Sequence, residues 1–92
     1  MNSVAAQIDI TGRVQGVGFR WYCLQHARRL GLTGWVKNNF DGSVSTYVEG
    51  DRGLIEAYID ELKLGPGSAH VAGLDVDWRP FTGKFKSFEV TR

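Results

Sequence analysis

The sequence predicts an α+β fold, in which an antiparallel sheet of four to five strands carries two helices on one face. Several stretches alternate apolar and polar residues, which is the pattern of a strand with one buried face. Two other stretches repeat apolar residues every three or four positions, which is the pattern of a helix with one buried face. Each helical stretch stands between two strand stretches, so one sheet face can pack both helices while the other meets solvent.

A glycine-rich loop joins the first predicted strand to the first predicted helix. Ala6, Ile8 and Ile10 alternate with polar residues, which predicts a strand that stops at Gly12. The apolar face of the helix that follows consists of Phe19, Cys23, Ala27 and Leu30. Gly31 is expected just beyond the helix, where a residue in the left-handed conformation commonly ends it.

The middle of the chain is predicted to form a β-hairpin. One strand covers residues 33–38 and the next covers residues 43–49, and Asp41-Gly42 between them is a strong turn signal. Turn chemistry is sufficient to explain this dipeptide, because aspartate and glycine both tolerate the backbone conformations of tight turns.

The remainder of the chain is predicted to form a helix and two strands. Asp51 is expected to cap the helix, and the Gly-Pro-Gly run over residues 65–67 to end it. A fourth strand is expected over residues 71–78, before Pro80, and a short terminal strand over residues 87–91. Val71 is out of phase with the alternation of the fourth strand, which predicts either a bulge or a later start.

The element order is strand, helix, strand, strand, helix, strand, followed by the short tail strand. This is the split βαβ, or ferredoxin-like, sandwich. We expect residues 1–92 to form a single domain, since this length suits one compact core. The architecture supports many unrelated functions, so function has to be argued from particular residues.

Composition excludes several classes of function. The net charge of +1 is too balanced for a protein whose main partner is nucleic acid, which requires a basic face. Cys23 is the single cysteine, which excludes an intrachain disulfide and a zinc site built from cysteines alone. No apolar run reaches the length of about 20 residues that a membrane span needs, and the N-terminus does not read as a secretory signal. We therefore expect a cytoplasmic protein. We also expect a monomer, because the pattern leaves no large apolar surface unexplained.

The loop over residues 12–18 has the composition of an anion site. Its glycines allow left-handed dihedrals and a close approach to a ligand, and the helix start adds free N–H groups and the positive dipole end. Arg20 follows directly and can bind a phosphate through two hydrogen bonds. The alternative is that the loop is only a tight connection. The dinucleotide fingerprint and the Walker A motif do not match, because the third glycine and the Gly-Lys pair are missing.

The sequence contains two long motifs. The first reads Gly12-Arg13-Val14-Gln15-Gly16-Val17-Gly18-Phe19-Arg20. The second reads Gly34-Trp35-Val36-Lys37-Asn38-Asn39-Phe40-Asp41-Gly42-Ser43-Val44, with Gly50 after it. They resemble the two signatures of the acylphosphatase family, and the first resembles its phosphate-binding signature. The order and separation of the motifs, the chain length and the strand–helix order also agree, so the resemblance covers essentially the whole chain.

The resemblance implies an acylphosphatase, a hydrolase that cleaves the carboxyl-phosphate anhydride bond of acyl phosphates to carboxylate and inorganic phosphate. It implies that the Arg20 guanidinium binds the phosphoryl group and that the Asn38 side chain holds the attacking water. It also implies a cradle of backbone N–H groups from Gln15, Gly16, Val17, Gly18, Phe19 and Arg20. Members of the family need no metal or other cofactor and form no phosphoenzyme. The implied partners are a small acyl phosphate and inorganic phosphate, the latter as product and inhibitor.

Other reactive residues have simpler explanations. Cys23 and Arg29 have the spacing found in cysteine-dependent phosphatases, but the residues between them contain no glycine and continue a helix. Cys23 is therefore expected to be a buried structural cysteine. His26 and His70 lack the partner spacing of a metal site. We expect His26 on the solvated side of the first helix and His70 in a loop.

The tryptophans Trp21, Trp35 and Trp78 are expected to pack in the core or half-exposed at its edge, rather than to form a stacking platform. Lys37 should point to the sheet face opposite to that of Asn38, because side chains alternate along a strand.

Two rival functions remain open. Sheets of this fold with exposed aromatic residues bind single-stranded RNA in the RRM family, although this chain has neither an RNP1-like run nor a net basic face. The chain could also bind an acyl or carbamoyl phosphate without releasing it efficiently, as a sensor or as part of a larger machine. A hydrolysis assay separates both from the enzyme.

Overall fold

The computed structural model describes residues 2–91 and contains two helices and five strands in the predicted order. The elements are β1 (Ser3–Arg13), α1 (Phe19–Arg29), β2 (Thr33–Asn38), β3 (Val44–Asp51), α2 (Arg52–Leu64), β4 (His70–Pro80) and β5 (Phe88–Val90). No helix within residues 2–91 is long and apolar enough to cross a membrane.

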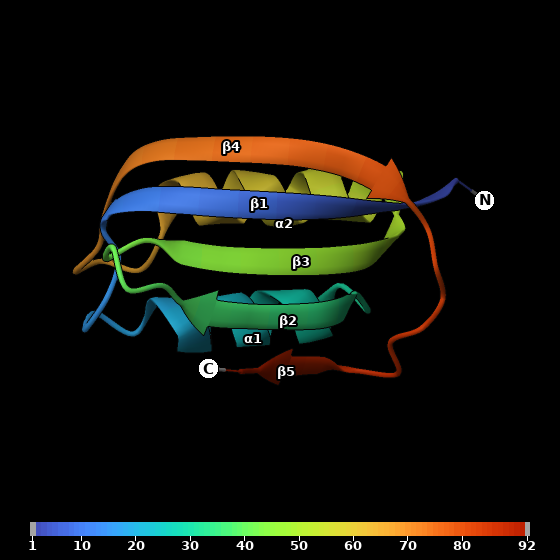
Figure 1. Cartoon of the computed structure of the whole chain (residues 1–92), viewed down its shortest axis with the longest axis horizontal. Coiled ribbons are helices and arrows are strands. Elements are labelled where there is room, and N and C mark those ends of the chain that lie inside the picture. Colours follow the sequence, from blue (N-terminus) through green and yellow to red (C-terminus); the bar gives the residue numbers. More distant parts are fainter. Residues whose placement is uncertain (1, 92) are drawn as a thin grey trace.

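The strands form one sheet in the order β4-β1-β3-β2-β5 (Figure 1). The prediction of an antiparallel sheet holds for the four long strands, which all pair antiparallel. The short strand β5 instead pairs with β2 in parallel, so the complete sheet is mixed. The parallel pairing arises because the chain crosses from β4 at one edge to the opposite edge before β5 begins, and β5 therefore runs in the direction of β2 (Figure 1).

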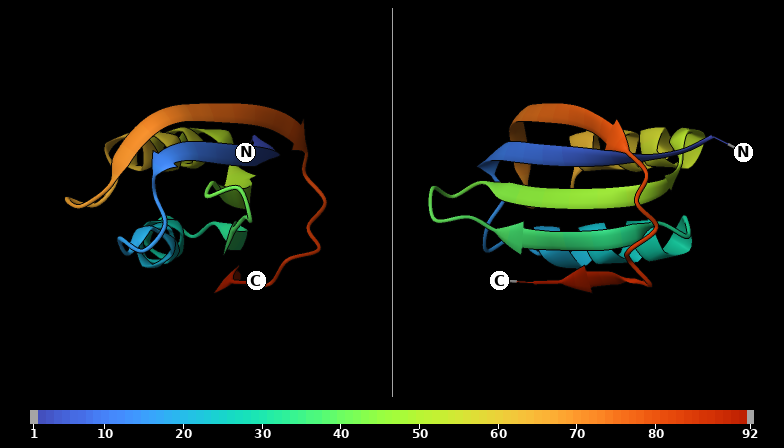
Figure 2. Two further views of the ribbon diagram at one scale, coloured as in Figure 1. Left: turned by 60° about the vertical axis from the view of Figure 1, so that its left-hand side comes forward. Right: turned by 45° about the vertical axis from the view of Figure 1, so that its right-hand side comes forward.

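Both helices cover the same face of the sheet, as predicted, and the other face is open (Figure 2). The core lies between these layers and joins the inward side chains of the strands to the apolar faces of the helices. Its largest fully buried side chains include Tyr58, Phe19, Phe88, Ile8 and Ile10. The hydroxyl of Tyr58 shares a hydrogen bond of 2.9 Å with that of Thr46, so this buried polar pair is satisfied.

A bulge near Gly12 explains the irregular start of the fourth strand. The pairing of β1 with β4 shifts between Thr11 and Gly12, and Ala72 is skipped in the register. Val71 and Leu74 can therefore both face the core, which confirms the bulge alternative. Gly12 has φ +122°, and a Cβ there would lie 2.2 Å from the carbonyl oxygen of His70, so only glycine fits.

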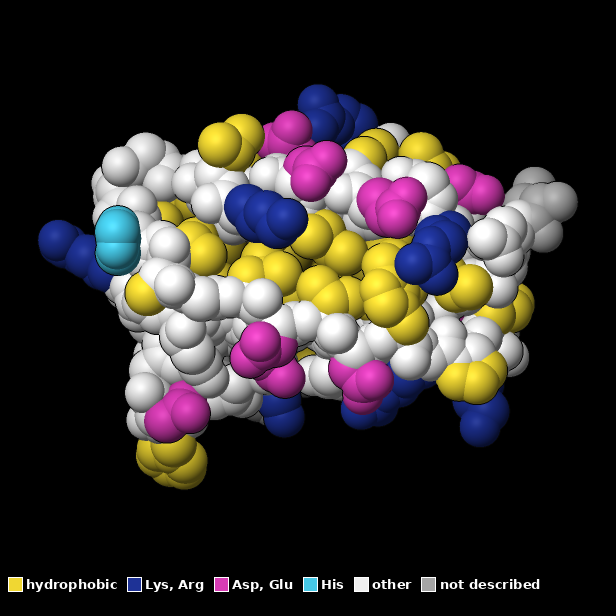
Figure 3. Space-filling model, turned by 90° about the horizontal axis from the view of Figure 1, so that it is seen from above, with side chains coloured by type: hydrophobic (Ala, Val, Ile, Leu, Met, Phe, Trp, Pro, Cys, Tyr) yellow, Lys and Arg dark blue, Asp and Glu magenta, His cyan; other side chains and the backbone are white. Residues whose placement is uncertain are grey.

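The helix ends follow the predicted signals. Gly31, with φ +70°, follows α1, and Gly65 follows α2. Asp51 caps α2, since its carboxylate accepts a hydrogen bond of 3.3 Å from the Leu54 N–H. Along the β4 edge, the side chains of Leu74 and Trp78 remain partly exposed, and Figure 3 shows a band of apolar side chains crossed by charged ones.

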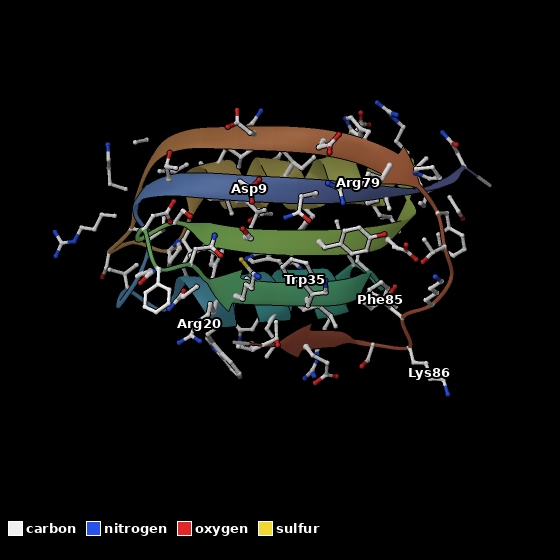
Figure 4. All side chains as sticks on the ribbon, in the orientation of Figure 1. Asp9, Arg20, Trp35, Arg79, Phe85 and Lys86 are labelled. Atoms are coloured by element: carbon white, nitrogen blue, oxygen red, sulfur yellow. The ribbon has the colours of Figure 1, made fainter. Side chains whose placement is uncertain are left out.

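A strap over residues 81–87 crosses from β4 to β5 and is held by the buried carboxylate of Glu49. This carboxylate accepts hydrogen bonds from the N–H and hydroxyl of Thr82, at 3.1 and 2.7 Å, and from the Gly83 N–H at 2.9 Å. It also accepts one from the Tyr47 hydroxyl. The Tyr47 ring stacks on Trp35 and packs against Phe85 of the strap. Trp35 and Phe85 lie on the open face of the sheet (Figure 4).

The surroundings of Glu49 and Tyr47 shift the pKa values of both side chains. Burial acts to raise the pKa of Glu49, but the hydrogen bonds from Tyr47, Thr82 and Gly83 outweigh it, so the pKa lies below its ordinary value. Burial, together with the neighbouring carboxylate, raises the pKa of Tyr47 to about 12. A lowered pKa means that Glu49 stabilises the folded state when it is ionised.

We predict that Glu49→Gln lowers the free energy of unfolding at pH 7 by about 1–3 kcal/mol, because an amide cannot accept all of these hydrogen bonds. The contribution of Glu49 is complete above its unfolded pKa of about 4.3 and is lost as the pH falls through its lower folded pKa. Urea titrations between pH 7 and 3 should therefore show a steeper loss of stability below about pH 4.3 in the unmodified protein than in the variant. Equal pH profiles would contradict the role of Glu49. Glu56→Gln, on the exposed face of α2, is the matched control.

Candidate active site

β1 and β2 end, and α1 begins, at the same end of the sheet (Figure 1). A pocket of about 320 Å³ lies there. It is lined by Val14, Gly16, Gly18, Phe19, Arg20, Trp21, Asn38 and Val90. The structure thus brings Arg20 and Asn38 to one pocket, together with three residues of the predicted loop, Val14, Gly16 and Gly18.

The loop between β1 and α1 presents unpaired backbone N–H groups. Gly16 and Gly18 have φ +71° and +78°, which is the left-handed region that glycine adopts without steric cost. No side chain caps α1, and the first helical N–H with a backbone partner is that of Tyr22, which donates to the Gly18 carbonyl at 3.0 Å. Within residues 2–91, the N–H groups of residues 15–21 have no hydrogen-bond partner. Such a run, at the positive end of a helix dipole, can bind an anion.

Arg20 lies in the first turn of α1, directly after the loop (Figure 4). Its guanidinium makes neither an ion pair nor a hydrogen bond with any other described side chain, and the first turn contains no acidic residue. The positive charge of Arg20 is therefore available to a ligand in the pocket, and its planar fork suits a phosphate.

Asn38 is the last residue of β2 and shares the inward face of that strand with Val36. Its Oδ1 atom is buried and has no hydrogen-bond partner among the described residues. Nearly all buried polar atoms in folded proteins are hydrogen-bonded, so an exception that lines a pocket indicates a site for a donor from outside the protein. Lys37 lies on the opposite face, with its Nζ atom 5.5 Å from the centre of the Trp35 ring, as predicted from the strand period.

The Gln15 side chain ties the loop to the β2–β3 hairpin. Its Nε2 atom donates to the carbonyl oxygens of Asn39 at 2.7 Å and of Ser43 at 2.9 Å. The loop that carries the N–H groups is thereby fixed to the turn that follows Asn38. The sequence assigned only a backbone role to Gln15, and no local signal indicates partners 24 and 28 positions away.

A polar network on the same hairpin was also missed by the sequence analysis. The Asn39 amide donates to the Ser43 and Ser45 hydroxyls at 2.8 and 2.7 Å, and the Ser45 hydroxyl donates to Asp9 at 2.6 Å. Asp41 accepts from the N–H of Ser43 at 2.9 Å, which confirms that it is a turn residue. Hydrogen bonds from Ser43 lower the pKa of Asp41, so it is ionised at neutral pH. The turn beside Asn38 is thus rigidly organised.

The remaining reactive residues lie outside the pocket. Cys23 is fully buried in α1, and burial raises the pKa of its thiol to about 12, which agrees with a structural cysteine rather than a nucleophile. The described residues contain no group of three His, Cys, Asp or Glu side chains that could hold a metal ion.

Three expectations about ring side chains need correction. The side chain of His26 is only 17% exposed, because Glu61 of α2 lies 3.6 Å from its ring and the Tyr22 ring packs on it. His70 is the first residue of β4 rather than part of a loop. Trp21 is 61% exposed, and thus neither in the core nor half-exposed at its edge, because it lies on the side of α1 that faces the pocket and solvent.

The fold and the pocket together define an α+β protein with a pocket at a helix N-terminus, beside unpaired backbone N–H groups and Arg20. The sequence model of the acylphosphatase family matches residues 6–90, so the chain belongs to that family. An acylphosphatase of Salinibacter ruber is 48% identical over 83 residues, which cover 90% of this chain and 87% of that one. An acylphosphatase of Thermococcus kodakarensis is 47% identical over 90 residues, which cover 98% of each chain.

Solved structures agree with the sequence comparisons. The crystal structure of acylphosphatase from Bacillus subtilis superposes with a TM-score of 0.94 at 30% identity, covering 97% of this chain and 99% of that one. The crystal structure of full-length HypF, in a phosphate- and nucleotide-bound form, matches 99% of this chain with 12% of its own length, at a TM-score of 0.91 and 35% identity. The same fold therefore also occurs within a much longer protein.

We predict that Gln15→Ala lowers the free energy of unfolding by about 1–2 kcal/mol, because it removes two hydrogen bonds that join the loop to the hairpin. The measurement is a urea titration followed by circular dichroism. Gln25→Ala, on the exposed face of α1, is the matched control and should change stability by less than about 0.5 kcal/mol. Equal effects of the two substitutions would contradict the role of Gln15 in joining the loop to the hairpin.

Proposed function

We propose that this protein hydrolyses acyl phosphates at the pocket between the β1–α1 loop and β2, as a single domain and without a metal. The observation that carries the proposal is the meeting of three features at one pocket. These are the unpaired N–H groups of the loop, the unpaired charge of Arg20 and the buried, unpartnered amide oxygen of Asn38. Membership of the acylphosphatase family supports the reaction class, a hydrolase acting on acid anhydrides.

The loop and Arg20 bind the phosphoryl group. The backbone N–H groups of residues 15–20 surround its oxygens, and the Arg20 guanidinium adds charge-assisted hydrogen bonds. In phosphoryl transfer the transition state is loose, and negative charge spreads over the equatorial oxygens. Donors that are already oriented before the reaction stabilise this charge without reorganising, which is where the rate enhancement arises.

Asn38 orients the attacking water. Its Oδ1 atom accepts a hydrogen bond from the water and holds the oxygen in line with the bond that breaks. An amide is too weak a base to remove the proton, so the proton passes to a phosphoryl oxygen of the substrate. Asn38 is therefore a positioning group for water and not a general base.

No general acid is required at the leaving group. The bond that breaks joins phosphorus to a carboxylate oxygen, and the carboxylate leaves with its electron pair as a resonance-stabilised anion that needs no proton at neutral pH. This agrees with the pocket, since Arg20 is its single titratable lining residue among those the structure describes.

We further propose that the protein is a monomer and that it is cytoplasmic. A buried free thiol such as Cys23 suits a reducing compartment.

We predict that the purified protein hydrolyses benzoyl phosphate in excess EDTA, measured as the loss of ultraviolet absorbance. Arg20→Gln and Asn38→Ala should each lower kcat by about 10²–10³, the usual effect of removing one oriented group from a transition state. Arg29→Gln, at the far end of α1, is the control and should retain activity. Absence of hydrolysis by the folded, unmodified protein would contradict the proposal and favour a protein that binds acyl phosphates without cleaving them.

Inhibition by inorganic phosphate should separate the two roles. Arg20→Gln should raise the inhibition constant about tenfold or more, because it removes charge-assisted hydrogen bonds to the bound anion. Asn38→Ala should change it by less than about twofold, because Asn38 holds water rather than phosphate. Equal losses of phosphate affinity in both variants would contradict this division of roles.

A further inference from the structure

The rim of the pocket contains two apolar side chains that the proposed chemistry does not use. Gly16, Gly18 and Arg20 serve the phosphoryl group, and Asn38 serves the water. Val14 and Phe19 line the pocket but are buried in the core, each with 1% of its surface exposed. The two lining residues that remain are Trp21, which is 61% exposed, and Val90, which is 42% exposed.

Packing does not account for the position of Trp21. It is absent from the buried core cluster and from the apolar residues packed against that cluster. Its ring makes no aromatic contact with any other side chain of residues 2–91. An exposed indole beside a ligand pocket is the residue type that binding sites use for large contact area at a small cost in conformational entropy.

Val90 is held at the pocket by the parallel pairing of β5 with β2. Val36 and Val90 are partners in the register, and the Thr91 N–H donates to the Val36 carbonyl at 2.8 Å. β5 is thereby fixed to β2 at Val36, which lies two residues before Asn38. The apolar rim thus combines a residue of α1 with one of the terminal strand.

We propose that Trp21, with Val90, binds the acyl half of the substrate and selects uncharged apolar acyl groups, aromatic ones above all. The inference rests on the proposed function. An in-line reaction places the acyl group on the side of phosphorus away from the water, so this group lies clear of the water on Asn38 and meets the other walls of the pocket. Those walls offer no counter-charge besides Arg20, which binds the phosphoryl group. An indole face and a branched aliphatic side chain suit a planar aromatic group.

The test compares kcat/KM for benzoyl phosphate with kcat/KM for acetyl phosphate, which shares the reacting bond but lacks the ring. In Trp21→Ala, the ratio of the two values should fall about tenfold, as expected for a lost apolar contact in a specificity pocket. Trp21→Phe should retain most of the ratio, and Val90→Ala should lower it by less than Trp21→Ala does. Phe81→Ala, an exposed aromatic residue lining a separate groove by the strap, is the matched control and should leave the ratio unchanged.

Two failures can be distinguished. If Trp21→Ala hydrolyses both phosphates with an unaltered ratio, the acyl site at Trp21 is wrong, while the proposed function stands. If the folded, unmodified protein hydrolyses neither compound, the proposed function is wrong, and the acyl site is overturned with it. A fall in the ratio of equal size in Phe81→Ala would also overturn the acyl site, because the effect would then not depend on the pocket.

Discussion

The turn from β1 into α1 is the constraint on which the site depends, because it leaves a run of backbone N–H groups without partners at one end of the sheet. Positive φ at Gly16 and Gly18 makes this path possible, and a side chain at either position would disfavour it. Unpaired N–H groups are costly when they are withdrawn from water, so the loop must be held by other contacts. Val14 and Phe19 anchor its two ends in the core, and the Gln15 amide fixes its middle to the hairpin.

The same arrangement explains how two distant motifs form one site. β2 lies beside α1 in the folded chain, and its period of two residues turns Asn38 toward the helix side of the sheet and Lys37 away from it. The hydrogen bonds of Asn39 and Asp41 make the turn after Asn38 rigid. The water-positioning role proposed for Asn38 requires this rigidity, because small displacements of a reacting group have large effects on rate.

The far end of the molecule also contributes to the pocket. Glu49 holds the strap over residues 81–87, the strap brings β5 to the edge of β2, and β5 places Val90 at the rim. The polar floor of the pocket therefore depends on local features of the β1–α1 loop, whereas its apolar rim depends on the path of the C-terminal segment. With the roles proposed above, the acyl contact can therefore vary without a change in the groups proposed to bind phosphate.

The element order, the helix ends and the residues of the two motifs could be predicted from the sequence, because these features depend on neighbours along the chain. Alternation and helical spacing report which side chains face a core, and Gly31 and Asp51 act within one turn of backbone. Three features could not be predicted in this way and were seen first in the folded protein: the parallel pairing of β5, the burial of His26 against α2 and the exposure of Trp21. Periodicity shows the face on which a side chain lies, but what covers that face depends on strand order and on packing between segments far apart in the chain.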